Sequence, residues 1–197
     1  MKTLGLISII FFAILAVAIT FIGCGDNSHP GTPTSERLDA EECVVYSSLI
    51  RNMYKAELIV IKEETESFTV TEETLKYIKK VLPEIEQETL GDFKEKNKNN
   101  HTLIKNSDIE GNNVFIAEKE AEDIFKEKNG WDEFYEKYPN SQGIMSLSRV
   151  GFNGKKNQAL VSVGNQSHWL AGNGYYILLV KENNIWLIKG KVLSWIS

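Results

Sequence analysis

The chain has 197 residues, of which 42% are hydrophobic, 25% charged and 10% aromatic. This composition supports a hydrophobic core and excludes wholesale disorder, and the length suits one domain. The formal net charge of −5 disfavours contact with a phosphate backbone, so we expect no nucleic-acid partner.

The N-terminal segment is long and apolar. Lys2 is its one charged residue before Asp26, and the apolar run stops at Gly23-Cys24. A run of this length is typical of a cleaved signal peptide, an uncleaved membrane helix or a lipoprotein signal. Plain cleavage after Ala18 would leave an apolar stub at the new N-terminus, which disfavours that choice.

The residues at the end of this run, FIGC at 21–24, resemble the bacterial lipobox. In proteins with that signal the cysteine is diacylated and the chain is cleaved just before it; Phe21 departs from the aliphatic residue usual at its position. The resemblance implies a signal peptide over 1–23 and a lipid on Cys24, whose thiolate would be the acylated nucleophile. Two acyl chains give stable anchoring. We therefore expect a bacterial cell-envelope protein, anchored to a membrane with its domain outside the cytoplasm.

Residues 24–38 are rich in Pro, Gly, Ser and Thr and indicate a flexible tether ahead of a single domain over 39–197. The chain has two cysteines. With a lipid on Cys24, Cys43 stays single, and its position on the apolar face of a predicted helix indicates a buried thiol. With Cys24 free in an oxidising compartment, a disulfide between the two would be possible.

The first half of the domain predicts mostly helices. Apolar residues at helical spacing after the cap Asp39 predict a helix over 40–54, and the short apolar run 58–61 predicts a strand. Thr71 caps a second predicted helix, and Pro83 suits the first turn of a third.

The middle of the chain begins with a Lys- and Asn-rich loop over 94–113. A brief strand at 114–116 and a helix over 118–126 follow. Four aromatic residues then share one helical face, which is typical of core packing rather than of a ligand platform. They are Trp131, Phe134, Tyr135 and Tyr138.

After Gly143 the apolar period changes from helical to alternating, which predicts strands at 144–152, 158–163, 175–181 and 185–189. A phase slip near Gly190 indicates a β-bulge. Helices first and a meander last predict an α+β fold, in which helices cover one face of a four- to five-stranded antiparallel sheet.

The C-terminal third, with the phrases FYEKYP, SRVGFN, QALV, GYYILLVK and WIS, resembles a family of uncharacterised bacterial secreted or lipid-anchored proteins. A weaker likeness covers YSSLIRNMY. The resemblance implies one envelope-exposed domain and supplies no activity. The order of elements is also similar to cystatin-like and nuclear-transport-factor-like folds, which host enzymes and binding modules alike.

The stretch 164–174, GNQSHWLAGNG, predicts a loop in which amides and an aromatic face suit a sugar or peptide. The alternative is a long connection whose Trp packs on the domain edge. A guanidinium in an apolar strand needs a carboxylate partner or a ligand anion. The candidate ligand-binding residues are therefore Arg149, Asn165, Gln166, Ser167, His168 and Trp169.

No spacing in the chain predicts a catalytic triad, a metal site or a cofactor. We expect a non-enzymatic envelope module that touches a protein, peptide or glycan through the stretch 164–174. The alternative is a small-molecule enzyme with a cavity between the helices and the curved sheet, with Arg149 or His168 as polar anchor. That alternative needs titratable groups converging in a pocket, and it fails if aromatic side chains fill the concave face of the sheet.

Overall fold

The computed structural model describes residues 38–103 and 109–197, which form five helices and seven strands. The helices are α1 (Ala40–Met53), α2 (Glu72–Val81), α3 (Gln87–Lys96), α4 (Glu118–Phe125) and α5 (Gly130–Lys137). The strands are β1 (Leu58–Lys62), β2 (Asn113–Ile116), β3 (Ser141–Leu147), β4 (Gly151–Phe152), β5 (Gln158–His168), β6 (Ala171–Glu182) and β7 (Ile185–Ile196).

The predicted signal peptide, the lipid site Cys24 and the tether up to residue 37 lie outside the described residues. Among the helices of the described part, none combines the length and the apolar character needed to cross a membrane.

Two predicted helix starts are confirmed by their caps. The Asp39 side chain accepts a hydrogen bond from the amide of Glu41 at the start of α1, and that of Thr71 accepts one from Thr74 at the start of α2. The third helix begins four residues after Pro83, because residues 83–86 turn to bury Ile85 and place the amide of residue 86 on a side chain of β5.

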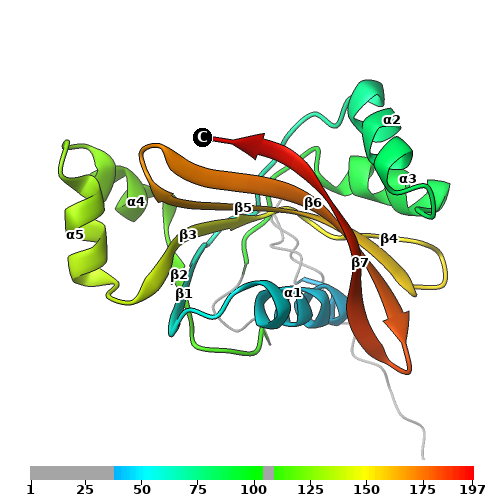
Figure 1. The fold of residues 1–197 in the computed structure, drawn as a ribbon, viewed down its shortest axis with the longest axis horizontal. Helices are drawn as coiled ribbons and strands as arrows, with labels where there is room; N and C mark the ends of the chain where they lie inside the picture. Colours follow the sequence, from blue (N-terminus) through cyan, green and yellow to red (C-terminus); the bar gives the residue numbers. More distant parts are fainter. Residues whose placement is uncertain (1–37, 104–108) are drawn as a thin grey trace, which may run out of the picture. The chain divides into compact units, whose positions relative to one another are not determined.

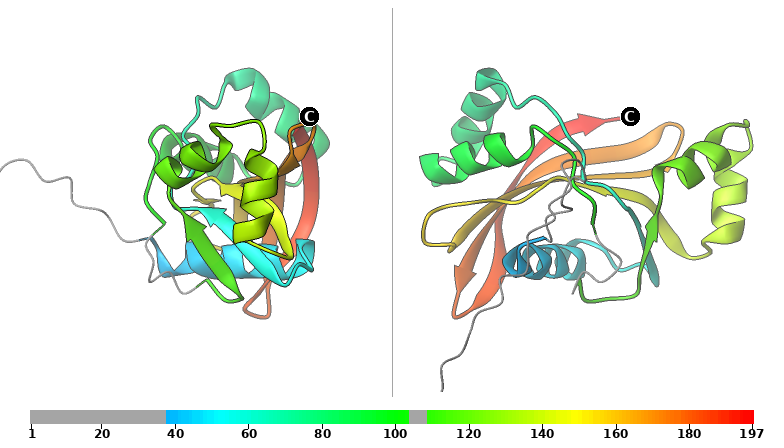
Figure 2. Two further views of the ribbon diagram at one scale, coloured as in Figure 1. Left: turned by 90° about the vertical axis from the view of Figure 1, so that its left-hand side faces the viewer. Right: turned by 180° about the vertical axis from the view of Figure 1, so that it is seen from behind.

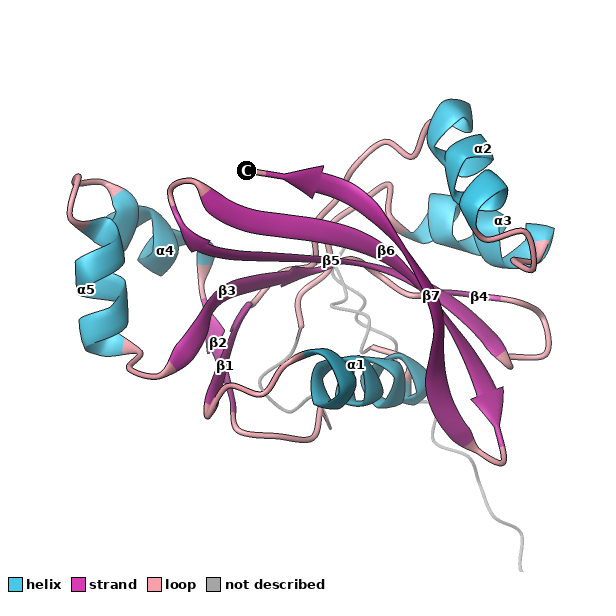
Figure 3. Ribbon diagram, viewed as in Figure 1, coloured by secondary structure: helices cyan, strands magenta, loops and turns pink. Residues whose placement is uncertain are grey.

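The predicted α+β class is confirmed, and the sheet is larger than expected (Figure 3). Its strand order is β2-β1-β3-β5-β6-β7, with β4 beside β5. The extra strands are β1 and β2, which pair in parallel with each other, while β1 also pairs in parallel with β3. The predicted strand 144–152 is divided into β3 and β4. The predicted bulge is confirmed, since Leu178 pairs with Gly190 and Leu179 with Ile188, which leaves Lys189 as the extra residue.

The prediction of a loop over 164–174 is wrong. β5 continues to His168 and β6 begins at Ala171, so that only Trp169 and Leu170 turn the hairpin. Gly164 pairs with Gly174 within a continuous antiparallel ladder.

Helices lie on both faces of the sheet, rather than on one as predicted (Figures 1 and 2). On one face, α1 packs on alternate residues of the central strands such as Ile61, Met145 and Val161. On the other face, α2 and α3 pack on Leu160 and Leu178 of the sheet, and a separate cluster forms where α4 and α5 pack elsewhere on it. This second face therefore carries two helix pairs with a strip of sheet between them.

The predicted burial is confirmed for Cys43 and for three of the four aromatic residues, whereas Tyr135 is only partly buried. Cys43 is buried in the cluster under α1. Of the four aromatic residues on α5, Trp131, Phe134 and Tyr138 are buried and pack with Val60 and Ile144 of the sheet.

Candidate functional site

The strip of sheet between the two helix pairs is made of small and polar residues. Cross-strand pairing aligns three of them with a tryptophan in one row across β3, β5, β6 and β7. The row is Ser146, Gly164, Gly174 and Trp195. The neighbouring row pairs Ser162 with Tyr176. On this face, the large apolar residues Ile144 of β3, Leu160 of β5 and Leu178 of β6 pack under the helices, and the middle of these strands is uncovered.

Three glycines provide a floor for the Trp195 indole. A methyl group on Gly172 would lie 2.9 Å from Cζ3 of Trp195, and one on Gly164 would lie 3.1 Å from Cζ2. A methyl group on Gly174 would overlap the indole nitrogen. The glycines are therefore required by close approach of the ring, which lies along the sheet while 40% of the residue remains exposed.

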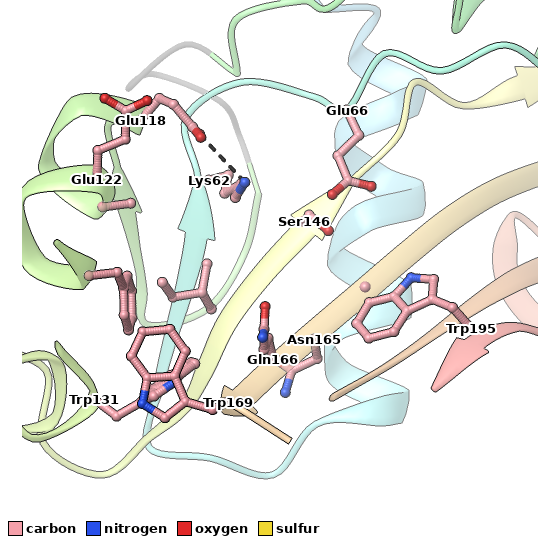
Figure 4. Close-up of a pocket in the computed structure, with 14 residues that line it drawn as sticks. Lys62, Glu66, Glu118, Glu122, Trp131, Ser146, Asn165, Gln166, Trp169 and Trp195 are labelled. Carbon is pink, nitrogen blue, oxygen red and sulfur yellow. Dashed lines mark ion pairs between the residues drawn. The ribbon is translucent and has the colours of Figure 1, made fainter. Parts of the chain in front are cut away.

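Two adjoining pockets, of about 340 and 550 Å³, form one groove along this strip, because Lys62, Glu66, Glu118 and Trp195 line both. Figure 4 shows Trp195 on one side of the first pocket and Trp131 and Trp169 on the opposite side, with Ser146 and Gln166 between them. We call this the tryptophan groove. Its further lining residues include Ala121, Glu122, Phe125, Ile144, Gly164, Asn165, Glu64, Thr65, Ser67, Phe68, Asn100, Ser162, Tyr176 and Ser194.

The hairpin between β5 and β6 carries Trp169 to the helical wall of the groove. Its ring meets Phe125 edge-on with centroids 5.7 Å apart and Trp131 edge-on at 6.4 Å. Tyr135 of α5 donates a hydrogen bond to the carbonyl of Ser167 at 2.9 Å, which ties the hairpin to this wall. Trp169 remains 45% exposed, so one side of the ring is supported and another is open.

Carboxylates dominate the charge of the groove. Its described lining residues include four of them, on Glu64, Glu66, Glu118 and Glu122, against the single ammonium of Lys62, hence a local charge of 1 − 4 = −3. Lys62 is itself paired with Glu118 at 3.5 Å.

Tyr176 adds a hydrogen-bond donor to the groove. Burial raises the pKa of its hydroxyl, and the charge of Glu66 raises it further. The hydroxyl is therefore protonated at neutral pH and available as a donor.

The candidate residues predicted on 164–174 divide into two groups. Asn165, Gln166 and Trp169 line the tryptophan groove. Ser167 and His168 are not among its lining residues: the Ser167 hydroxyl donates to the carbonyl of Ala171, and the His168 ring stacks on Trp131 with centroids 6.2 Å apart.

Arg149 lies away from the groove and has the carboxylate partner that the sequence indicated as one of two possibilities. Its Nε donates to Glu42 at 2.9 Å and its terminal nitrogen at 2.7 Å, in a bidentate pair. Glu42 has no exposed surface, and it also accepts from the amide of Val150 at 3.3 Å. The pair joins α1 to the segment between β3 and β4.

Sequence reasoning missed Trp195 and the charged residues of the groove. Lys62 ends β1 and Glu66 follows it, whereas Glu118 and Glu122 belong to α4. These segments meet at the groove only in the folded sheet, where β1 pairs with β2 and β3. A signal for Trp195 was present in the alternation of small or polar residues at Ser162, Gly164 and Gln166. It became meaningful only with the strand register.

Within residues 38–103 and 109–197, no group of three or more His, Cys, Asp or Glu side chains is placed to hold a metal ion. Comparisons with protein-family models, with curated proteins and with solved structures found no match to this chain. The resemblances noted from the sequence, to a bacterial lipoprotein family and to two fold classes, therefore stay predictions.

Proposed function

We propose that this chain is a non-enzymatic binding module of the bacterial cell envelope, anchored to a membrane through an acylated Cys24. The tryptophan groove is its ligand site. The observation that carries the proposal is the position of Trp195, whose indole is held flat on a glycine floor, partly exposed, opposite a second exposed indole. A rigid, half-open aromatic surface beside amides and carboxylates offers both apolar contact and oriented hydrogen bonds to a ligand.

The anchor part of the proposal is supported by the lipobox-like residues 21–24 and the polar, Pro-rich segment that follows them. A tether of that composition would let the domain reach a ligand at some distance from the membrane. The ligand would then be a component of the envelope: a protein, a peptide or a glycan.

The alternative function, a small-molecule enzyme, has weaker support. A cavity between helices and sheet does exist, and its middle is not filled by the α5 aromatics, which pack at one end. The two anchors expected for that function are occupied elsewhere, because Arg149 binds Glu42 and the His168 ring stacks on Trp131.

The proposal is tested by photo-crosslinking in intact cells. Benzoylphenylalanine replaces Glu122, an exposed residue of the groove, and in a matched control it replaces Tyr77, which is 48% exposed on α2. We expect an adduct of reproducible mass at position 122 and none at position 77. Equal labelling at both positions, or none at either, would contradict a ligand site in the groove.

A further inference from the structure

We propose, resting on the proposed function, that the ligand of the tryptophan groove is a saccharide without acidic groups, stacked on the Trp195 indole. A sugar ring presents an apolar C–H face and a rim of hydroxyl groups. The groove presents the matching set, an open indole face next to carboxylate, amide and hydroxyl side chains.

The strand pairing of the floor favours a saccharide over a peptide. β5 lies between β3 and β6, and β6 lies between β5 and β7, so the ladder uses the backbone groups beneath the groove. An extended peptide lying over β5 and β6 would find no free backbone groups in the floor, because the unpaired edge of the sheet on this side is that of β7. Recognition must therefore come from side chains, which suits a ligand whose own hydrogen-bonding groups are hydroxyls.

Charge selects among saccharides. With four carboxylates and one ammonium group among the described lining residues, the groove repels uronic acids and phosphorylated sugars. Lys62 offsets one carboxylate, that of Glu118, with which it is paired, and the other three carboxylates remain. Neutral sugars and amino sugars are compatible with the same charge, because carboxylates accept hydrogen bonds from hydroxyl and ammonium groups.

Some residues that line the groove carry buried polar atoms without a hydrogen-bond partner. Six buried side-chain polar atoms have no hydrogen-bond partner among the described residues, and three of them belong to groove residues: Trp131 Nε1, Asn165 Oδ1 and Ser194 Oγ. Buried polar atoms without partners are rare because they cost free energy. A hydroxyl group both donates and accepts, so side-chain rotation on binding would let one ligand type pair with all three.

The test is calorimetric titration of the full-length protein in detergent. The probes are maltotriose, triacetylchitotriose, its deacetylated cationic trimer, trigalacturonate and a trilysine peptide. We expect at least one neutral or cationic trisaccharide to bind about tenfold more tightly than trigalacturonate, and Trp195→Ala to weaken that binding about tenfold, as loss of one stacking contact predicts. Trp195→Phe, which keeps an aromatic ring on the floor, should retain part of the affinity.

Leu187→Ala is the matched control, because Leu187 is an exposed apolar residue of the same strand that lies outside the groove lining. The inference is overturned if trigalacturonate binds as tightly as the other sugars, if trilysine alone binds, if no probe binds, or if Trp195→Ala keeps full affinity while folded. In each of these cases, an adduct at position 122 in cells would still uphold the proposed function, so the two failures are distinguishable.

Discussion

Trp195 lies on Gly174, its cross-strand partner on β6, so closely that a side chain at position 174 would overlap the indole. The contact explains why a strand of the sheet carries glycine at a position where β-branched residues are favoured. The position of the indole, and with it the shape of the tryptophan groove, therefore depends on the absence of a side chain at position 174.

A side chain introduced at position 174 tests whether the indole depends on this close approach. Gly174→Ala should displace the indole and lower the free energy of unfolding by about 1–3 kcal/mol, the usual cost of overpacking. Gly91→Ala is the control, because α3 has open space around Gly91 and the exchange should be neutral or stabilising by up to about 1 kcal/mol. Urea denaturation followed by circular dichroism measures both; equal effects would contradict the close approach.

The pair between Glu42 and Arg149 is predicted to be structural. Arg149→Met leaves the carboxylate of Glu42 buried without its main partner, and we expect a loss of about 3–5 kcal/mol in unfolding free energy. Arg51→Met, which removes an ion pair between two largely exposed side chains, should cost less than about 1 kcal/mol.

The same denaturation experiment discriminates the two roles once considered for Arg149. If the Arg149→Met protein keeps its stability and loses ligand binding instead, the guanidinium is a ligand anchor after all. If Glu42→Gln restores part of the lost stability in the double variant, the unpaired charge was the cause.

Stability should decrease on the acid side because of two carboxylates at the start of α1. The hydrogen bond from Lys156 and then that from the amide of Glu41 lower the pKa of Asp39. Burial works against ionisation of Glu41, but hydrogen bonds from Lys181 and Trp186 outweigh it and lower the pKa of this residue too. Carboxyls with lowered pKa in the folded state stabilise it above their ordinary values of 3.8 and 4.5, and this contribution is lost as the pH falls through the folded values.

We therefore expect the unfolding free energy to decrease below about pH 4.5, and the double variant Asp39→Asn, Glu41→Gln to show a shallower decrease. Asn still caps a helix, so the comparison isolates the charge. The urea concentration at the unfolding midpoint, measured for both proteins between pH 2.5 and 7, gives the two stability curves. Parallel curves for the two proteins across this range would show that these groups carry no acid sensitivity.

Acylation of Cys24 predicts a mature protein that begins at this residue and carries a lipid. Intact-mass measurement of the protein extracted from bacterial membranes should give the mass of residues 24–197 plus acyl groups, and the Cys24→Ser variant should lack the acyl groups and keep residues 1–23. Retention of residues 1–23, or an unmodified thiol at Cys24, would overturn the envelope placement.

Local signals in the sequence predicted most elements of the fold. Asp39 and Thr71 marked helix starts because capping depends on neighbouring residues alone, and the aromatic spacing on α5 indicated its buried face. The parallel pairing of β1 with β3 was not predictable in this way, since it joins segments some 80 residues apart and depends on the whole fold.

The candidate site was predicted in part. Gln166 and Trp169, predicted as ligand-binding residues of a loop, line the groove, but the glycines around them were interpreted as loop residues, since glycine and polar amides are depleted in strands. The glycines are explained by Trp195 of β7, which follows them by 21 to 31 residues and needs small residues beneath its ring. Arg149 was predicted as a ligand-binding residue, but the buried carboxylate of Glu42, 107 residues earlier, accounts for its position in an apolar segment without any ligand.

The most direct test of the tryptophan groove uses the four indole N–H signals of the protein. Trp169 and Trp195 are exposed, whereas Trp186 is 1% exposed in the core under α1. In nitrogen-15 NMR titrations with maltotriose, triacetylchitotriose and the deacetylated trimer, we expect the trisaccharide that binds most tightly to shift the Trp195 indole signal most and to leave the Trp186 signal in place. An unmoved Trp195 signal, or equal shifts of all four, would contradict this expectation.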